Sequence, residues 1–220
     1  MDQRKRVLIV GGVAGGAAAA ARARRVSEDA QIVMFERGEH ISFANCGLPY
    51  HIGGVIERRE KLLVQTVQGM KAWYGIDVRV RTEVLRIDRE TKQVVVRDLT
   101  TGNESYEPYD ALILSPGAAP VRPPIEGANL PHVLTLRNLA DMDAIKRVVD
   151  EMQPGRAIVM GGGYIGLEMA EALRQRKVEV TLAELAPQVF IAADPEMAEL
   201  LHQQLRLHGV DLRLGTSVTS

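Results

Sequence analysis

Residues 6–36 combine two apolar runs, a glycine-rich turn and a helix in an order that leaves few possible folds. Arg6–Val10 is a short apolar run without interruption, which is typical of a parallel strand covered on both faces. Gly11–Gly16 follows as a turn, and Ala17–Val26 has the alanine and arginine content of a helix. A second apolar run, Gln31–Phe35, ends directly at Glu36. This order predicts a βαβ unit and therefore an α/β fold with a parallel sheet.

The same pattern begins again 150 residues later in the chain. Arg156–Met160 is the predicted strand, Gly161–Gly166 the turn, and Leu167–Arg176 the helix. Val178–Ala183 is the next predicted strand, and it ends at Glu184. Two copies, each with its own terminal acid, predict two Rossmann-like dinucleotide-binding domains.

Both glycine turns have the parts that a dinucleotide site needs. Glycine lets the backbone turn tightly and approach a pyrophosphate, the helix dipole favours that anion, and the acid can bind ribose hydroxyls. The second turn matches G-x-G-x-x-G in full at Gly161, Gly163 and Gly166, whereas Val13 takes the middle glycine position of the first. The alternative is that the glycines only let a helix pack closely against a strand.

Two dinucleotide sites in one chain suggest a flavin that exchanges electrons with a nicotinamide. Glu184 can accept hydrogen bonds from both hydroxyls of the adenosine ribose, and it would repel a 2′-phosphate. The residues that follow it, Leu185–Val189, include no arginine to bind such a phosphate. We therefore expect FAD and NADH as cofactors, and we expect NADPH to be disfavoured.

The rest of the chain predicts a β-meander and a division into two domains. The stretch 116–131 is rich in proline and glycine and has no periodic pattern, so we interpret it as the crossover between domains. The expected domains are an FAD-binding domain at 1–119 and an NAD-binding domain at 120–220. Further predicted elements are a helix at 66–74, the meander at 77–88, 92–98 and 104–109, a strand at 111–114, helices at 138–152 and 195–207, and a strand at 211–214.

Cys46 is the only cysteine of the chain and follows Glu36 by ten residues. This places it beyond the second strand, at the carboxyl side of the sheet, where α/β proteins bind ligands. Small and turn-forming residues crowd the stretch Ile41–Tyr50, and a helix N-terminus predicted nearby would favour the thiolate. The pattern indicates a reactive thiol, and the alternative is a buried structural cysteine.

Composition and charge exclude several function classes. The net charge is −1, and basic residues are interspersed with acidic ones, so we expect no nucleic-acid or membrane partner. Arg4–Arg6 before an apolar run imitates a secretion signal, but the glycines of 11–16 interrupt that run. A single cysteine cannot form an internal disulfide, which fits a reducing compartment, so we expect a cytoplasmic protein. We expect no metal site.

The two glycine turns together with three short stretches, Ser42–Tyr50, Leu114–Gly117 and Thr135–Asn138, resemble the pyridine nucleotide–disulfide oxidoreductases. The resemblance covers essentially all 220 residues. The Ser-Phe-x-x-Cys-Gly block resembles the corresponding block in the branch of the family that has one redox cysteine. Within that branch, the Ala-Asn pair before Cys46 resembles members that reduce CoA disulfide, CoA persulfide or polysulfide. Members with two cysteines would need the second one where Ile41 or His51 stands.

This resemblance implies a role for each part of the site. Cys46 would alternate between a thiolate and a mixed disulfide with CoA, and NADH would supply the electrons through the flavin. In NADH oxidases and peroxidases, the nearest alternative within the branch, the cysteine cycles through sulfenic acid. Residues implied to contact FAD are Gly11, Gly12, Val13, Ala14, Gly15, Gly16, Glu36, Arg37, Ser115, Pro116 and Gly117. Those implied for the nicotinamide nucleotide are Gly161, Gly162, Gly163, Tyr164, Ile165, Gly166, Glu168 and Glu184.

The resemblance also implies contacts with CoA. Arg22 and Arg25 lie three residues apart on one helix face and could clamp phosphates, although a solvated basic face has the same pattern. Ala18 stands where a small hydroxyl residue is common in the family, and Tyr74 where lysine is common. The implied CoA residues are Arg22, Arg25, Ser42, Asn45 and Lys71, the last as a substitute for the missing lysine.

The family pattern continues beyond the equivalent of Ser220. Its members return to the flavin domain and end in a dimerisation domain that supplies residues across a homodimer. We therefore expect the chain to be a truncated first half of such an enzyme, which alone would hold FAD weakly and turn over little. A non-catalytic nucleotide-binding fragment is the alternative from a different functional class.

Overall fold

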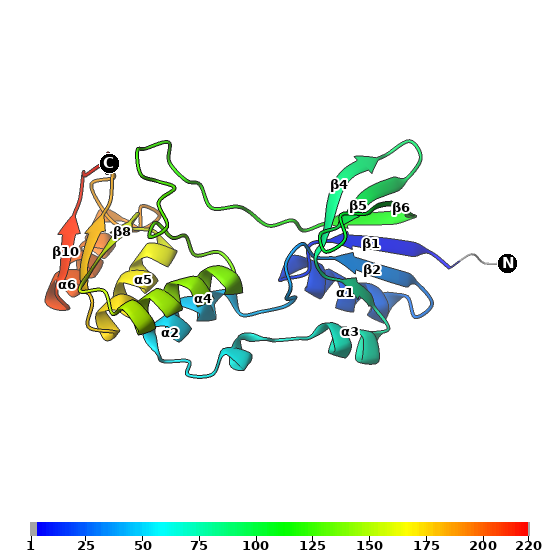
Figure 1. Ribbon diagram of the computed structural model, residues 1–220, viewed down its shortest axis with the longest axis horizontal. Coiled ribbons are helices and arrows are strands. Elements are labelled where there is room, and N and C mark those ends of the chain that lie inside the picture. The colour runs from blue at the N-terminus through cyan, green and yellow to red at the C-terminus, as the bar shows by residue number, and fades with distance from the viewer. Residues whose placement is uncertain (1–3, 220) are drawn as a thin grey trace. The chain divides into compact units, whose positions relative to one another are not determined.

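The structure is a computed structural model, and it describes residues 4–219 (Figure 1). Its contacts divide the chain into two compact units. The first unit contains Met1–Ala44 and Leu63–Ala118, and the second contains Asn45–Leu62 and Ala119–Ser220. Each unit has a parallel sheet with helices, so the predicted α/β fold with two Rossmann-like units is confirmed.

The sheet of the first unit has four parallel strands in the order β3-β2-β1-β7. Leu8 and Ile9 are neighbours in the central strand, and neither is exposed to solvent. Since neighbouring side chains of a strand point to opposite faces, both faces of the sheet are covered. This explains why the strand reads as a continuous apolar run. The strands are β1 (Arg6–Val10), β2 (Gln31–Phe35), β3 (Asp77–Arg79) and β7 (Ala111–Leu114).

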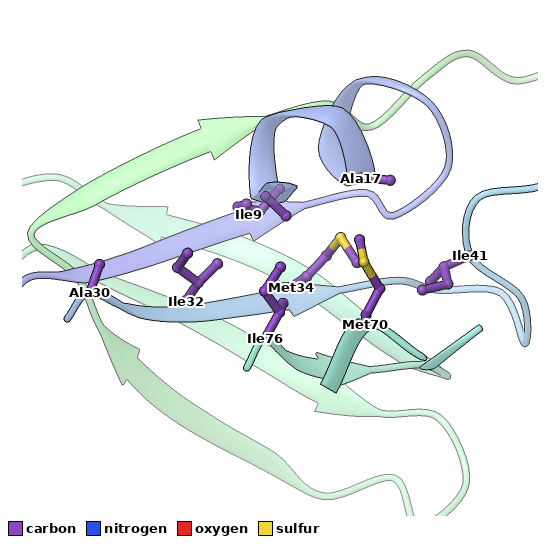
Figure 2. Packing of buried hydrophobic residues seen from close by; sticks show 9 residues of the cluster. Ile9, Ala17, Ala30, Ile32, Met34, Ile41, Met70 and Ile76 are labelled. Carbon is purple, nitrogen blue, oxygen red and sulfur yellow. The ribbon is translucent and has the colours of Figure 1, made fainter. Parts of the chain in front are cut away.

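Helices α1 (Gly15–Val26) and α3 (Val67–Tyr74) cover one face of this sheet. Figure 2 shows the cluster they bury, in which the side chains of Met34 and Met70 point toward one another. The alanines of α1 let the helix backbone lie close to the strands, because Ala17 and Ala20 are buried against the sheet. Thr66 caps α3 by accepting a hydrogen bond from Gly69 N at 3.0 Å.

A three-stranded antiparallel meander covers the other face. Val94 and Val96 of the meander pack against Leu8, Val33 and Phe35 of the sheet. The predicted β-rich segment 77–88 is divided, because its first strand joins the parallel sheet and the chain then turns at Arg81, which has a φ of 50°. The meander strands are β4 (Thr82–Asp88), β5 (Gln93–Asp98) and β6 (Glu104–Pro108).

The second unit repeats the Rossmann-like pattern with three parallel strands in the order β10-β9-β8. Helix α5 begins at Tyr164, within the predicted turn 161–166 and three residues earlier than predicted. The predicted helix at 138–152 begins as an α-helix capped by Asn138 and changes to a π-helical turn. The elements are α4 (Leu139–Arg147), η3 (Val148–Met152), β8 (Arg156–Met160), α5 (Tyr164–Gln175), β9 (Glu179–Ala183), α6 (Pro195–Leu207) and β10 (Val210–Arg213).

The segment that carries Cys46 groups with the second unit, whereas we expected it within 1–119. It forms η1 (Asn45–Gly47), α2 (Leu48–Gly53) and η2 (Arg59–Leu62). Helix α2 packs against α4 and α5, and glycine at 53 permits this because an added Cβ would lie 3.2 Å from Ala172 Cα. The assignment of one cofactor to each domain remains a proposal.

Ion pairs and hydrogen bonds anchor this segment to the second unit. Arg59 of this segment pairs with Asp143 of α4 at 2.8 Å, and Arg176 donates to the carbonyl of Ile52 at 3.1 Å. Arg176 is itself held by a hydrogen bond to Asp150 within the π-helical turn. Burial acts to raise the pKa of Asp150, but hydrogen bonds from Arg176 and Lys146 outweigh it and hold that pKa below its usual value. These polar contacts explain why the segment follows the second unit although it comes early in the chain.

No helix within residues 4–219 combines the length and the apolar character needed to cross a bilayer. The same part of the chain has no group of three or more His, Cys, Asp and Glu side chains arranged to hold a metal ion.

Candidate functional site

Strand register brings three predicted site segments of the first unit together. Val10 is paired with Phe35 on one side and with Leu114 on the other, so these three strands end at the same level. The residues that follow them are the first glycine of the turn, Glu36 and Ser115. The main chain ties them together, because Gly11 N donates to Phe35 O at 2.8 Å and Ser115 N donates to Val10 O at 2.7 Å.

Two glycines of the first turn are required by packing alone. Gly11 has a φ of 91°, and a Cβ there would lie 2.0 Å from Ser115 O. A Cβ on Gly16 would lie 1.7 Å from Gly11 O, inside the turn that precedes α1. The close-packing alternative therefore explains these two positions without any ligand. The turn still places α1 with its N-terminus at the carboxyl edge of the sheet.

Glu36 holds the first turn in shape. Its Oε2 accepts a hydrogen bond from Gly12 N at 2.7 Å, and its Oε1 accepts one from Gly38 N at 2.7 Å. The carboxylate keeps further lone pairs, and it is only partly buried, so it can also accept from a ribose hydroxyl.

Glu184 repeats this arrangement in the second unit. Its Oε2 accepts from Gly162 N at 2.6 Å, and its Oε1 accepts from Ala186 N at 2.7 Å. Sequence reasoning assigned both acids to a ribose and missed their bonds to the turn. These bonds could have been expected from the sequence, because each acid comes directly after a strand, and this position puts its side chain beside the neighbouring glycine turn.

Packing does not explain every glycine of the second turn. A Cβ on Gly166 would lie 1.9 Å from Gly161 O, so this position is structural, as at Gly16. A Cβ on Gly163 would meet no atom within 4 Å, and its φ of −78° suits any residue. Glycine at position 163 thus leaves open space beside the backbone, which is what a closely bound pyrophosphate requires.

The helices after both turns begin without a capping side chain. No side chain accepts a hydrogen bond at the N-cap of α1 or α5, whereas Thr66 caps α3 and Asn138 caps α4 with a capping box. The first N–H groups of α1 and α5 are therefore available to an anion at the positive end of the helix dipole. Turn, helix end and acid fit a dinucleotide in each unit.

A loop that sequence reasoning did not assign to the site lies against the second turn. Val189 packs on Gly162 so closely that an added Cβ there would lie 2.8 Å from a Val189 methyl carbon. Phe190 N donates to Gly162 O at 2.8 Å, and the Phe190 ring meets the Tyr164 ring edge-on at 4.5 Å. Buried His202 of α6 supports the loop by accepting from Val189 N at 3.2 Å. The available signal was a histidine on the buried face of an amphipathic helix.

Cys46 is exposed in the short η1 turn that precedes α2. The alternative of a buried structural cysteine is therefore wrong. The helix begins two residues after the thiol and is six residues long. His51 is buried and its Nδ1 lies 2.6 Å from Ile56 O, so its ring is engaged by the backbone.

The residues implied to bind CoA fall in both units. Arg22 and Arg25 are exposed on α1, and neither has an ion-pair partner among the described residues. Their neighbour Arg24 differs, because it donates to the carbonyls of Tyr74 and Gly75 and holds the end of α1 in place. Lys71 and Ser42 also lie in the first unit, and Asn45 lies in the second.

Several other predicted residues are accessible. Tyr164 and Ile165 are 69% and 55% exposed at the start of α5, and Pro116 and Gly117 are exposed after β7. The Arg37 guanidinium is exposed and lies 3.5 Å from Glu83. Val13 and Ala14 lie in the first turn. Glu168 lines a groove of about 610 Å³ between α5 and α6.

We expect Glu36→Gln to destabilise the first unit. A glutamine amide can accept from only one of the two N–H groups that the carboxylate holds, and its NH₂ group would face the other. Losing one bond of this charged kind costs about 1.5–3 kcal/mol. Glu39→Gln is the matched control, because Glu39 is exposed and pairs with Arg81. Urea unfolding of both variants checks this, and equal midpoints would contradict the assigned role of Glu36.

Comparison with known proteins agrees with this geometry. The family described as "Pyridine nucleotide-disulphide oxidoreductase" matches residues 5–220. A coenzyme A disulfide reductase of Staphylococcus haemolyticus is 36% identical over 98% of this chain and 48% of its own length. An NADH oxidase of Methanocaldococcus jannaschii is 34% identical over 95% of this chain and 47% of its own length. The chain thus spans about half the length of the curated relatives it matches.

Solved structures are similar over nearly the whole chain. Reduced Bacillus anthracis CoADR-RHD is 50% identical with a TM-score of 0.96, over 99% of this chain and 39% of its own. An NAD-dependent persulfide reductase from A. fulgidus is 37% identical with a TM-score of 0.94, over 98% of this chain and 40% of its own.

Proposed function

This chain belongs to the pyridine nucleotide-disulphide oxidoreductase family, and from that membership we propose that it is part of an FAD-dependent oxidoreductase that uses NADH. The proposed substrates are CoA disulfide, CoA persulfide or polysulfide, reduced through Cys46. The observation that carries the proposal is an exposed single cysteine in a chain with two dinucleotide turns. The names of the coenzyme A disulfide reductase and persulfide reductase relatives support the substrate class.

The first turn would hold FAD and the second NADH. In each unit the bare glycine backbone and the uncapped helix would bind the pyrophosphate, and Glu36 or Glu184 would bind the adenosine ribose. A bound flavin supplies the chemistry of accepting two electrons from a nicotinamide and passing them to a disulfide. Ser115–Gly117, beside the first turn, would border the FAD.

Cys46 would carry the substrate step. Its thiolate attacks one sulfur of CoA disulfide, an S–S bond forms between Cys46 and one CoA, and the other CoA leaves as a thiolate. Two electrons from NADH then cleave this mixed disulfide and return the Cys46 thiolate and the second CoA thiol. The balance is one NADH and one proton consumed for each CoA disulfide, with two CoA thiols and one NAD⁺ formed.

We also propose the site that recognises CoA. Arg22 and Arg25 have guanidinium groups without ion-pair partners in the described chain, so they are available to phosphates. Ser42, Asn45 and Lys71 complete the proposed set. A cytoplasmic homodimer completes the proposal for the enzyme as a whole.

An NADH oxidase or peroxidase is the second candidate, because the Methanocaldococcus jannaschii relative is named an NADH oxidase. Cys46 would then cycle through sulfenic acid with oxygen or peroxide as the acceptor. Steady-state assays of the protein that carries this chain, supplied with FAD, separate the candidates. We expect NADH consumption to depend on CoA disulfide or persulfide. Equal consumption with oxygen alone would favour the oxidase.

We expect NADH to be preferred over NADPH. The carboxylate of Glu184 would lie beside the 2′-phosphate of NADPH, and Leu185–Val189 provide no cation to offset the repulsion. We expect kcat/KM to be at least about tenfold higher with NADH than with NADPH, which corresponds to about 1.4 kcal/mol. Steady-state kinetics with the two nucleotides measure it, and an equal or higher value with NADPH would refute the assignment of Glu184.

A further inference from the structure

The backbone between β9 and α6 is held against the second glycine turn at three points. Glu184 accepts a hydrogen bond from Gly162 N, Val189 packs on Gly162, and Phe190 N donates to Gly162 O. Phe190 has a φ of 50°, which non-glycine residues rarely adopt, so this backbone is held in place by its surroundings. The loop therefore forms one wall of the turn that the proposed function assigns to NADH.

His202 is the side chain that fixes this wall from behind. It is 5% exposed, and its Nε2 accepts from Val189 N at 3.2 Å. Its Nδ1 lies 2.9 Å from Glu199 Oε2. Because Nε2 accepts, the ring proton lies on Nδ1 and is donated to the Glu199 carboxylate. The histidine thus connects a carboxylate on the surface of α6 to the buried backbone of the loop.

We propose that His202 is a positioning residue for the nicotinamide nucleotide, acting through Val189 and Gly162. This rests on the proposed function, since it assumes that the second turn binds NADH. Loss of the acceptor at Nε2 leaves the Val189 N–H buried without a partner, and the loop moves to satisfy it. Val189 then no longer supports Gly162, which belongs to the glycine turn of the proposed site.

Other charged groups do not take over this role. The loop from Leu185 to Ala193 carries no ionisable side chain. Around His202, the charged neighbours on α6 are Glu199 and Arg206, and these two lie 3.7 Å apart. On the packed strand β10, Asp211 and Arg213 are paired with each other. The charged residues of α5 near α6, namely Glu168, Glu171 and Arg174, line the groove with Leu201 and Gln204.

Two amide substitutions separate the two bonds of the ring. His202→Gln places an amide oxygen where Nε2 lies and keeps an acceptor for Val189 N. His202→Asn places its amide where Nδ1 lies, which keeps a partner for Glu199 and loses the acceptor. His208→Asn is the matched control, because His208 ends the same helix, is exposed and bonds Gln204 O.

The test measures KM and kcat for NADH, and Kd by fluorescence titration, in the protein that carries this chain. We expect His202→Asn to raise Kd and KM about tenfold with kcat nearly unchanged. We expect His202→Gln and His208→Asn to stay within about twofold of the unaltered protein. Unchanged Kd in His202→Asn, or equal weakening in His202→Gln, would overturn the role of His202 alone. Absence of NADH binding by the unaltered protein would overturn the proposed function and this inference with it.

Discussion

We expect Cys46→Ser to abolish the proposed reduction of CoA disulfide or persulfide while flavin stays bound. A serine hydroxyl does not ionise near neutral pH, whereas a cysteine thiol can form the reactive thiolate. Serine also cannot form a mixed disulfide, so no other group can carry out the covalent step. The chain offers no second thiol that could act instead. We expect the turnover number to fall by at least about 10³-fold, as it does when other enzymes lose their nucleophile.

This result is specific because Cys46 is exposed in a short turn and supports no core packing. The flavin absorbance and the thermal midpoint of the Ser variant are expected to match those of the unaltered protein. Cys46→Ala serves as a second variant with the same expected loss. Retention of full CoA-disulfide turnover in either variant would show that the assigned chemistry is mistaken.

Gly11→Ala is expected to destabilise the first unit strongly. The residue has a φ of 91°, and the added Cβ would lie 2.0 Å from the carbonyl oxygen of Ser115. Both the backbone strain and the overlap with main-chain atoms must be relieved by moving the turn away from β7. We expect a loss on the order of 3–5 kcal/mol in the free energy of unfolding.

Gly102→Ala is the control that measures the cost of the positive φ alone, without a steric overlap. Gly102 has a φ of 77°, but a Cβ there would meet no atom within 4 Å. Its substitution therefore costs only the left-handed conformation, about 1–2 kcal/mol. Urea unfolding of both variants gives the difference. Equal losses would mean that the contact between the turn and Ser115 does not constrain the fold.

The strands were the most predictable elements of the chain. Arg6–Val10, Gln31–Phe35, Ala111–Leu114 and Arg156–Met160 have the predicted bounds, because each is a short apolar run that ends at a turn. Helix starts were less predictable after a glycine turn. Helix α5 begins at Tyr164 without a capping side chain, so no residue marks its first position.

The site was predictable where it follows from strand register and unpredictable where it depends on packing between distant segments. Glu36 and Ser115 come directly after strands, so their place at the carboxyl edge was visible in the sequence. The docking of 45–62 on the second unit depends on Arg176 and on the close approach at Gly53, which no local pattern announces. The support of Val189 by His202 is equally non-local.

The central claim is that Cys46 carries the substrate as a mixed disulfide that NADH resolves. Intact-mass spectrometry of the FAD-supplied protein, treated with CoA disulfide and then with NADH, measures this directly. The account predicts one CoA adduct, located on the peptide that contains Cys46, and its disappearance after NADH is added. A protein that forms no CoA adduct, or one whose adduct persists with NADH while oxygen is consumed, would contradict the account.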